Sequence, residues 1–328
     1  MNKEYVNDLS YQFKDKVIVV TGSTQGSGAE TAKLFAARGA KAITICGRQE
    51  DKGQNVKKEI ESLGAQCIYV KADLSKVEDC KKIIYETDKN FGTIHSLVNI
   101  AGYTQRGTIL SATLENYESN FNVNTRAPFI LMQETIKIMI RDKIKGTIAN
   151  LLSMAMYSGM PFIVAYSGSK AALAAMTKNI ANSVSGHQIR VNALNIGWTD
   201  TPAEHDIQTK VHKGGEDWLE KAEKKVPFKR LTKPIDVAKA ISQKARLKIT
   251  GIRPGEKLHE EMITVSDAIN TIEFEDYFSI IPNSSYIEWD RKEYLKNEKS
   301  LGSYCSEDFT YNSGSNPNFL TVDKIREL

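Results

Sequence analysis

The sequence lacks several features that would assign it to a specialised class of protein. It has no apolar run of membrane-spanning length, and its polar N-terminus, MNKEYVNDLSYQFKDK, predicts no secretory signal. Lysine and arginine (44) barely outnumber aspartate and glutamate (40), and a net charge of +4 gives no reason to expect nucleic acid or an anionic membrane as a partner. The hydrophobic content of 41% is that of an ordinary soluble globular protein.

Cysteine is also scarce. The four thiols, Cys46, Cys67, Cys80 and Cys305, are scattered without the spacing of metal ligands. We therefore expect free thiols in a reducing cytoplasm and no metal site.

The first two thirds of the chain alternate between short buried β-type runs and amphipathic helical segments. This alternation predicts an α/β fold, a doubly wound parallel sheet (Rossmann fold) whose ligand lies at the carboxyl ends of the strands. One long helical region is expected from about Asn116 to Ile140. The expected strands are KVIVVTG, KAITICG, QCIYVKAD, SLVNIAG, GTIANLLS and IRVNALNIG.

The first strand runs into the glycine-rich turn TGSTQGSG, which opens a helix. Glycine lets the backbone turn tightly and approach a ligand, and the N-terminus of the helix offers free N–H groups to a pyrophosphate. The context predicts a dinucleotide site. The residues expected to contact it are Gly22, Ser23, Thr24, Gln25, Gly26 and Gly28.

The end of the second strand, ICGRQE, bears on the choice of cofactor. Gly47 stands where an NAD-binding chain usually has an acidic residue, and Arg48 follows it. Arginine suits a 2′-phosphate, so NADP(H) is favoured, with NAD possible and a solvated Arg48 as the alternative. Gln25 adds no second cation. After the third strand, Asp73 and Leu74 are expected near the adenine, although Asp73 could instead be the N-cap of the next helix.

Tyr166 and Lys170 stand four residues apart in AYSGSK. On a helix they would share one face. A surface pair can arise by chance, but a nearby ammonium and an oxidised nicotinamide would favour the phenolate. Tyr166 could then exchange a proton with a substrate oxygen near neutral pH.

Six motifs occur in the order found in short-chain dehydrogenases/reductases: TGSTQGSG, NIAG, NVN, LLS, YSGSK and RVNALNIG. The chain resembles that family over about residues 12–240. The resemblance implies that Tyr166 exchanges the proton, Ser153 holds the substrate oxygen, Lys170 also anchors the nicotinamide ribose and Asn124 holds a water in a proton relay. It also implies cofactor contacts from Asn99, Ala101, Gly102 and Thr201.

The segment after the sixth strand looks like a substrate lid. By analogy Trp198 points towards the substrate, and the alternative is a partly buried lid anchor. His205 and His212 are expected to be solvated. The final strand that usually closes the sheet in this family is not found.

The tail resembles a different group. GIRPGEKLHEEM is similar to the C-terminal part of the inverting UDP-N-acetylglucosamine 4,6-dehydratases of the polysaccharide-biosynthesis family, and the likeness covers about residues 245–328. It implies that Arg253 and Glu256 hold a nucleotide sugar, unless RPGEK is an exposed turn. Met154 and Ala155 stand where those enzymes have an Asp and a Lys. We expect a catalytic domain over 1–243 and a small α+β appendage over 244–328.

Together these features predict an NADP(H)-dependent oxidoreductase that interconverts a carbonyl and a secondary alcohol of a small molecule in the cytoplasm. One alternative is a nucleotide-sugar lyase resembling UDP-N-acetylglucosamine 4,6-dehydratase. Another is a catalytically idle chain that binds cofactor. The oligomeric state is left open, because family members commonly pair through elements that include the missing strand.

Overall fold

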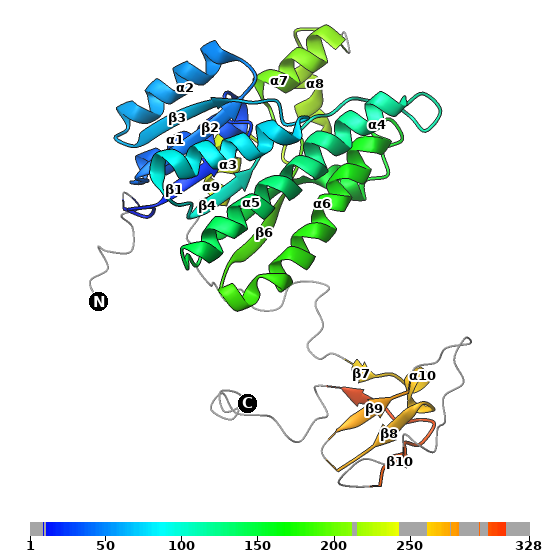
Figure 1. Cartoon of the computed structure of the whole chain (residues 1–328). Coiled ribbons are helices and arrows are strands. Elements are labelled where there is room, and N and C mark those ends of the chain that lie inside the picture. Colours follow the sequence, from blue (N-terminus) through cyan, green and yellow to red (C-terminus); the bar gives the residue numbers. More distant parts are fainter. Residues whose placement is uncertain are drawn as a thin grey trace. The chain divides into compact units, whose positions relative to one another are not determined.

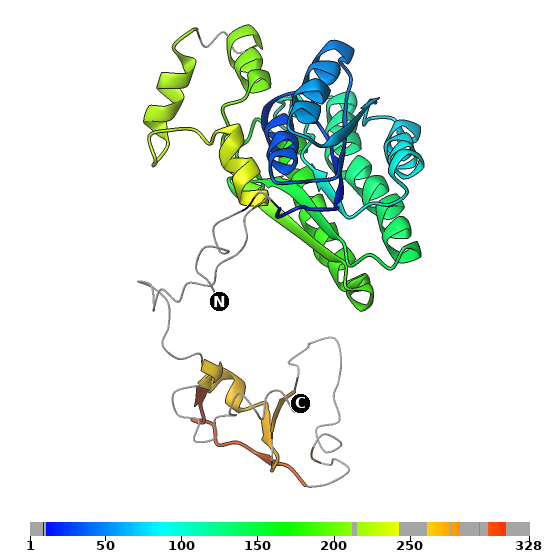
Figure 2. The same cartoon turned by 90° about the vertical axis from the view of Figure 1, so that its left-hand side faces the viewer.

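The structure is a computed structural model of the chain, and it describes residues 9, 11–211, 215–242, 261–275, 277–281, 295 and 301–312. The chain divides into two compact units, Met1–Lys244 and Ala245–Leu328 (Figures 1 and 2).

A six-stranded sheet forms the centre of the first unit, with the order β3-β2-β1-β4-β5-β6 and every neighbouring pair parallel. The strand order reverses beside β1, which pairs with both β2 and β4, so this is the switch point at which such sheets bind ligands. The strands are β1 (Val17–Val20), β2 (Ala42–Gly47), β3 (Gln66–Lys71), β4 (Ser96–Asn99), β5 (Thr147–Ser153) and β6 (Arg190–Ile196).

Two apolar cores, one on each face, hold the sheet. The four residues of β1 are all buried, as expected for a strand covered on both faces. Helices α3 (Val77–Phe91), α5 (Ala127–Arg141) and α6 (Val164–Ser183) cover the face seen in Figure 1. Helices α1 (Gly26–Ala37), α2 (Glu50–Ser62) and α9 (Pro234–Ile241) cover the other. The doubly wound parallel sheet expected from the sequence is confirmed.

The single helix expected from about Asn116 to Ile140 is interrupted. Helix α4 (Leu114–Phe121) passes into a π-helical turn (Asn122–Arg126), and α5 begins only at Ala127. The C-cap residue of this turn, Ala127, still donates its backbone N–H to the carbonyl of Asn122, five residues back. Such π-turns are rare and are frequently found at functional sites. This one carries Asn124.

The sheet ends at β6 within the described part of the first unit, where β6 pairs with β5 alone. After β6 the chain forms α7 (Pro202–Asp206), a π-helical turn (Ile207–Val211) and α8 (Trp218–Lys225) before reaching α9. No seventh strand is present among these residues, and the segment after α9, where the family's final strand would follow, lies outside the described residues.

The second unit is a small α+β body with two short sheets, of order β10-β8-β9 and β11-β7. Ile272, Phe274 and Ile281 form its apolar centre. Arg253 and Glu256, expected to bind a nucleotide sugar, lie outside the described residues. The elements are β7 (Glu261–Ile263), α10 (Val265–Ala268), β8 (Thr271–Glu273), β9 (Phe278–Ile280), β10 (Ser303–Tyr304) and β11 (Tyr311–Asn312).

Candidate active site

The glycine-rich turn at the switch point needs its glycines. Gly22 has φ of +61°, and a Cβ at this residue would lie 2.8 Å from the Cα of Ala101, in the turn after β4. A Cβ on Gly28 would overlap the carbonyl oxygen of Gly22. Both positions therefore admit no side chain, and the turn packs closely against the neighbouring strand end.

The N-terminus of α1 fits an anion. The helix begins at Gly26 after Gln25, no side chain caps it, and its first turn has no acidic residue. Its first N–H groups are therefore left for a ligand. Ser23 contributes differently, because its hydroxyl donates to the Val20 carbonyl (2.6 Å) and accepts from the Cys46 N–H (3.0 Å). Its side chain joins β1 to β2 and is fully buried.

At the end of β2, close packing explains why a glycine stands where an acidic residue is usual. A Cβ on Gly47 would lie 2.6 Å from Cγ2 of Thr24, so glycine here makes room for the turn. Arg48 follows and is exposed. Lys52, one turn into α2, donates from Nζ to Oε1 of Gln25 at 2.8 Å. A second cation therefore reaches the glycine-rich turn from another element, which sequence reasoning missed.

Asp73 lies at the start of a tight turn after β3. Its Oδ1 accepts from the backbone N–H (2.9 Å) and the hydroxyl (2.8 Å) of Ser75. Burial raises its pKa, but these hydrogen bonds and the charge of Arg48 outweigh burial and lower it. The N-cap of α3 is Lys76, so the alternative of Asp73 as that N-cap is wrong. Leu74 follows and packs on the apolar core.

The NIAG segment places its residues in different environments. Asn99 is buried and donates from Nδ2 to Oδ1 of Asn150 (2.8 Å), so its side chain bridges β4 and β5 inside the sheet. Ala101 and Gly102 lie at the surface of the turn. A Cβ on Gly102 would lie 3.8 Å from Oδ1 of Asn124 and 3.9 Å from Nζ of Lys170. Gly102 therefore lies where two expected catalytic residues meet.

Asn124 is fully buried and holds the NIAG turn in place. Its Oδ1 accepts from the Tyr103 N–H, and its Nδ2 donates to the Tyr103 carbonyl, both at 2.8 Å. Nδ2 also donates to the Ser169 hydroxyl of α6 (3.0 Å). These bonds use both protons of Nδ2 and one of the two lone pairs of Oδ1, so the side chain is largely committed to holding the turn.

Ser153 and Tyr166 are brought together at the end of β5 and the start of α6. The side chains of Ser153 and Thr104 lie near the Tyr166 hydroxyl. Burial raises the pKa of Tyr166, the neighbouring hydroxyls of Ser153 and Thr104 lower it and the charge of Glu204 raises it again, with a net increase. The protein by itself therefore keeps this phenol protonated, contrary to the lowering expected from a lysine neighbour. Thr104 was not expected in the site.

The environment of Lys170 accounts for the absence of the expected lowering of the Tyr166 pKa. Its side chain is 3% exposed, and Nζ donates to the Leu151 carbonyl of β5 at 2.7 Å. Burial lowers its pKa to about 8. The ammonium is thus held by the sheet, one turn beyond Tyr166 on the same helix.

The loop after β6 closes the site from the other side. Ile196 of β6 is in register with Ser153, so this loop starts at the catalytic end of β5. Thr201 is the N-cap of α7 and lies beside Gly26, where a Cβ would be 3.4 Å from its Cγ2. Trp198 donates from Nε1 to Oε1 of Glu204 at 2.7 Å and is 40% exposed.

Both histidines of the lid segment were expected to be solvated. His205 is exposed, as expected, and in addition its Nδ1 accepts from Nε1 of Trp218 at 2.9 Å and its ring packs edge-on against the indole. It is therefore a structural contact of the lid. His212 lies outside the described residues.

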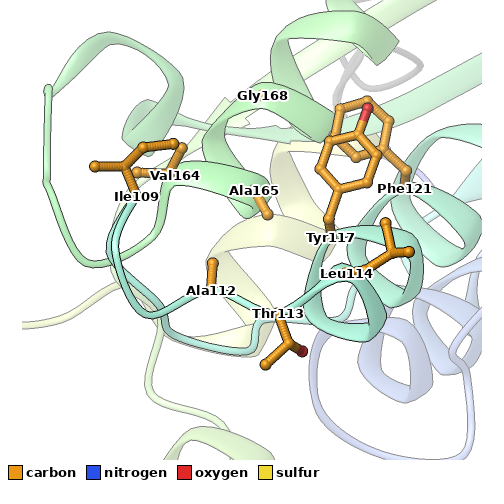
Figure 3. Close-up of a pocket in the computed structure, with 9 residues that line it drawn as sticks. All are labelled: Ile109, Ala112, Thr113, Leu114, Tyr117, Phe121, Val164, Ala165 and Gly168. Carbon is orange, nitrogen blue, oxygen red and sulfur yellow. The ribbon is translucent and has the colours of Figure 1, made fainter.

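An apolar pocket opens on the other side of α6 (Figure 3). It is formed by α4, the preceding loop and the start of α6, and the rings of Tyr117 and Phe121 stack at its edge. Val164 and Gly168 are each two residues from Tyr166, on the opposite side of the helix, and none of the expected catalytic residues lines this pocket, so it is distinct from the reaction site. Its lining is Ile109, Ala112, Thr113, Leu114, Tyr117, Phe121, Val164, Ala165 and Gly168.

In the residues that the structure describes, no group of three or more His, Cys, Asp or Glu could hold a metal ion. No helix of these residues combines the length and apolarity needed to cross a membrane.

Comparison with known proteins finds two different family models in the two parts of the chain, as the sequence motifs predict. The family model for short chain dehydrogenase matches residues 16–212, and the chain therefore belongs to this family of oxidoreductases. A second model, polysaccharide biosynthesis protein, matches residues 207–282. Both resemblances drawn from the sequence are confirmed, and the second begins within the lid, upstream of the expected residue 245.

Relatives are similar over the first unit. An uncharacterized oxidoreductase of Thermotoga maritima is 34% identical over 70% of this chain and 89% of its own. The 3-oxoacyl-(acyl-carrier-protein) reductase FabG of the same organism is 30% identical over 70% of this chain and 90% of its own. The structure of L-sorbose reductase from Gluconobacter frateurii, complexed with NADPH and L-sorbose, is 27% identical, with a TM-score of 0.67 over 72% of this chain and 90% of that one.

Proposed function

We propose that the protein is an NADP(H)-dependent oxidoreductase that interconverts a carbonyl and a secondary alcohol, with Tyr166 as proton donor and acceptor. The observation that carries the proposal is that Ser153 lies near the Tyr166 hydroxyl, with buried Lys170 one turn away. The glycine-rich turn adjoins this group through Gly102 and Ala101.

The site fits a dinucleotide. The close approach of Gly22 and Gly28 to their neighbours and the uncapped N-terminus of α1 leave backbone donors for a pyrophosphate. When bound, the nicotinamide supplies or accepts the hydride. Asn124 holds the turn that carries Gly102, next to Lys170.

The proton moves through this chain's own residues. Ser153 holds the carbonyl oxygen by a hydrogen bond, and Tyr166 delivers its proton to the same oxygen. The raised pKa of Tyr166 keeps the proton on the phenol until reduction places negative charge on the substrate oxygen. Lys170 then stabilises the phenolate that remains.

Replacement of Tyr166 tests this role. Tyr166→Phe should lower kcat for carbonyl reduction by about 10²–10⁴-fold, the usual contribution of general acid catalysis, while the Kd for NADPH stays within twofold. Tyr85→Phe is the matched control, because Tyr85 is 63% exposed on α3. An unchanged kcat in Tyr166→Phe would contradict the proposal.

The preference for NADP(H) rests on two cations. Arg48 follows β2, and Lys52 reaches the glycine-rich turn through Gln25, so both can neutralise a 2′-phosphate. Arg48→Ala and Lys52→Gln should each weaken NADPH binding by about 1.5–3 kcal/mol, or roughly 10- to 150-fold in Kd. NADH binding should change little. Titration by nicotinamide fluorescence measures both, with exposed Lys58→Gln on α2 as the control. Equal losses for NADPH and NADH would exclude a 2′-phosphate site.

The match of residues 207–282 to polysaccharide biosynthesis protein favours a second candidate, a nucleotide-sugar lyase. Met154 and Ala155, in the 3-10 helix after Ser153, supply no acid or base for loss of water. A lyase would copurify with its cofactor and convert UDP-N-acetylglucosamine without added NADP(H). An oxidoreductase would require added cofactor and change the absorbance of the nicotinamide.

A further inference from the structure

Glu204, which the sequence did not single out, lies beside the proposed reaction centre. It is on α7, whose N-cap Thr201 accepts from the Glu204 N–H at 3.1 Å and adjoins Gly26 of the glycine-rich turn. The loop before α7 starts at Ile196, the register partner of Ser153. The charge of Glu204 contributes, after burial, to the raised pKa of Tyr166.

Two neutral donors orient this carboxylate. Oε1 accepts from Nε1 of Trp198 at 2.7 Å and from Nε2 of Gln208 at 2.6 Å. Gln208 is 8% exposed, so the bond fixes Glu204 against the body of the lid. Among the residues that the structure describes, no lysine or arginine pairs with Glu204, and no donor reaches Oε2.

An oriented carboxylate without a cation has a defined chemistry. It accepts hydrogen bonds from hydroxyl groups and repels a second anion, and a half-buried site screens neither effect as water does. A lid contact alone would use Oε1 and would not need the charge.

We propose that Glu204 is a specificity-determining residue that accepts hydrogen bonds from the hydroxyls of a neutral, polyhydroxylated carbonyl substrate and excludes anionic ones. The inference rests on the proposed function, since it assumes that the carbonyl is reduced beside Tyr166 and Ser153. It names the substrate class of that site: hydroxyketones of the ketose type, with oxo acids disfavoured.

The test compares three substrates with NADPH: a neutral ketohexose, the matching ketohexuronate with a carboxylate in place of the terminal CH2OH, and cyclohexanone, which has neither. The wild-type chain should have a kcat/KM at least tenfold higher for the ketohexose than for the ketohexuronate. In Glu204→Gln this ratio should fall at least tenfold, mainly through KM, while kcat for cyclohexanone stays within threefold.

Two variants separate charge from structure. Glu204→Asp keeps the charge and should retain discrimination against the ketohexuronate, whereas Glu220→Gln on the exposed face of α8 should change nothing. The Kd for NADPH and the melting temperature show whether each variant is folded. Equal losses for all three substrates would make Glu204 a structural contact and overturn the inference, as would an unchanged ratio in a folded Glu204→Gln. If the wild-type chain reduced none of them and no carbonyl of a wider panel, the proposed function itself would fail.

Discussion

Lys170 carries a charge that the fold makes sensitive to pH. Burial lowers its pKa to about 8, while the raised pKa of Tyr166 keeps the phenol protonated through the neutral range. If the ammonium stabilises the phenolate left after proton transfer, its loss above pH 8 removes that stabilisation. Above neutral pH, the rate of the reaction should therefore depend on the titration of Lys170 and not on that of Tyr166.

We therefore expect kcat/KM for carbonyl reduction to be constant below about pH 8 and to fall above it as Lys170 loses its proton. Lys170→Arg, whose side chain stays charged, should lower the rate but lose this fall. The pH profile of initial rates measures both, with exposed Lys178→Arg on the same helix as control. A fall that persists unchanged in Lys170→Arg would assign the limit to another group.

Some properties of single residues in the site could not be predicted from the sequence. The spacing of Tyr166 and Lys170 predicts one helix face, but burial, which sets both pKa values, depends on the packing of β5 and α6. Lys52 was missed because it lies 27 residues from Gln25, on a helix whose exposed face has no special pattern. Glu204 was missed because a carboxylate in a polar lid segment carries no signal until Trp198 and Gln208 are placed.

At the scale of elements, one side chain adds hydrogen bonds to the apolar contact between α1 and α9. Arg38, the C-cap of α1, donates from Nη1 to the carbonyl (2.8 Å) and hydroxyl (2.9 Å) of Ser242, just after α9, and to Oε1 of Gln12 (3.0 Å). Gln12 donates in turn to the Ser242 carbonyl at 2.6 Å. Ser242 is 2% exposed, so water cannot replace these bonds readily.

Arg38→Met should therefore lower the free energy of unfolding of the first unit by about 1–3 kcal/mol, the cost of leaving buried polar groups unpaired. Urea denaturation followed by circular dichroism measures the loss. Lys41→Met, at an exposed position just before β2, should change the midpoint by little. Equal shifts in the two variants would show that the Ser242 bonds contribute nothing.

Element order was predictable because short buried β-type runs alternate with helical segments, and all six strands of the parallel sheet lie in the expected segments. The interruption of the helix at Asn124 was not predictable. The segment NVNTR has no proline or glycine to break a helix, and the π-turn depends on long-range hydrogen bonds to Tyr103 and Ser169.

At the scale of the whole molecule, each unit has apolar clusters built from its own residues. The two large cores and the lid cluster around Trp218 belong to the first unit, and the cluster around Ile272 belongs to the second. Each unit thus has its own centre, although the second is small.

A chain that ends at Lys244 should accordingly keep cooperative unfolding and bind NADPH within about threefold of the full-length Kd, because its cores remain complete. Differential scanning calorimetry and cofactor titration of the shortened chain measure these properties. An insoluble or non-cooperative product would show that residues after 244 are needed to complete the first unit.

β6 is an edge strand of the described sheet, and this position bears on self-association of the protein. In the described part of the chain its outer backbone groups face no neighbouring strand, which is the arrangement that invites strand addition by another molecule. Arg190, Asn192 and Asn195 are exposed along it. A guanidinium and two amides on an edge strand oppose the addition of an apolar strand from another chain, so replacement of these three side chains by valine should favour self-association.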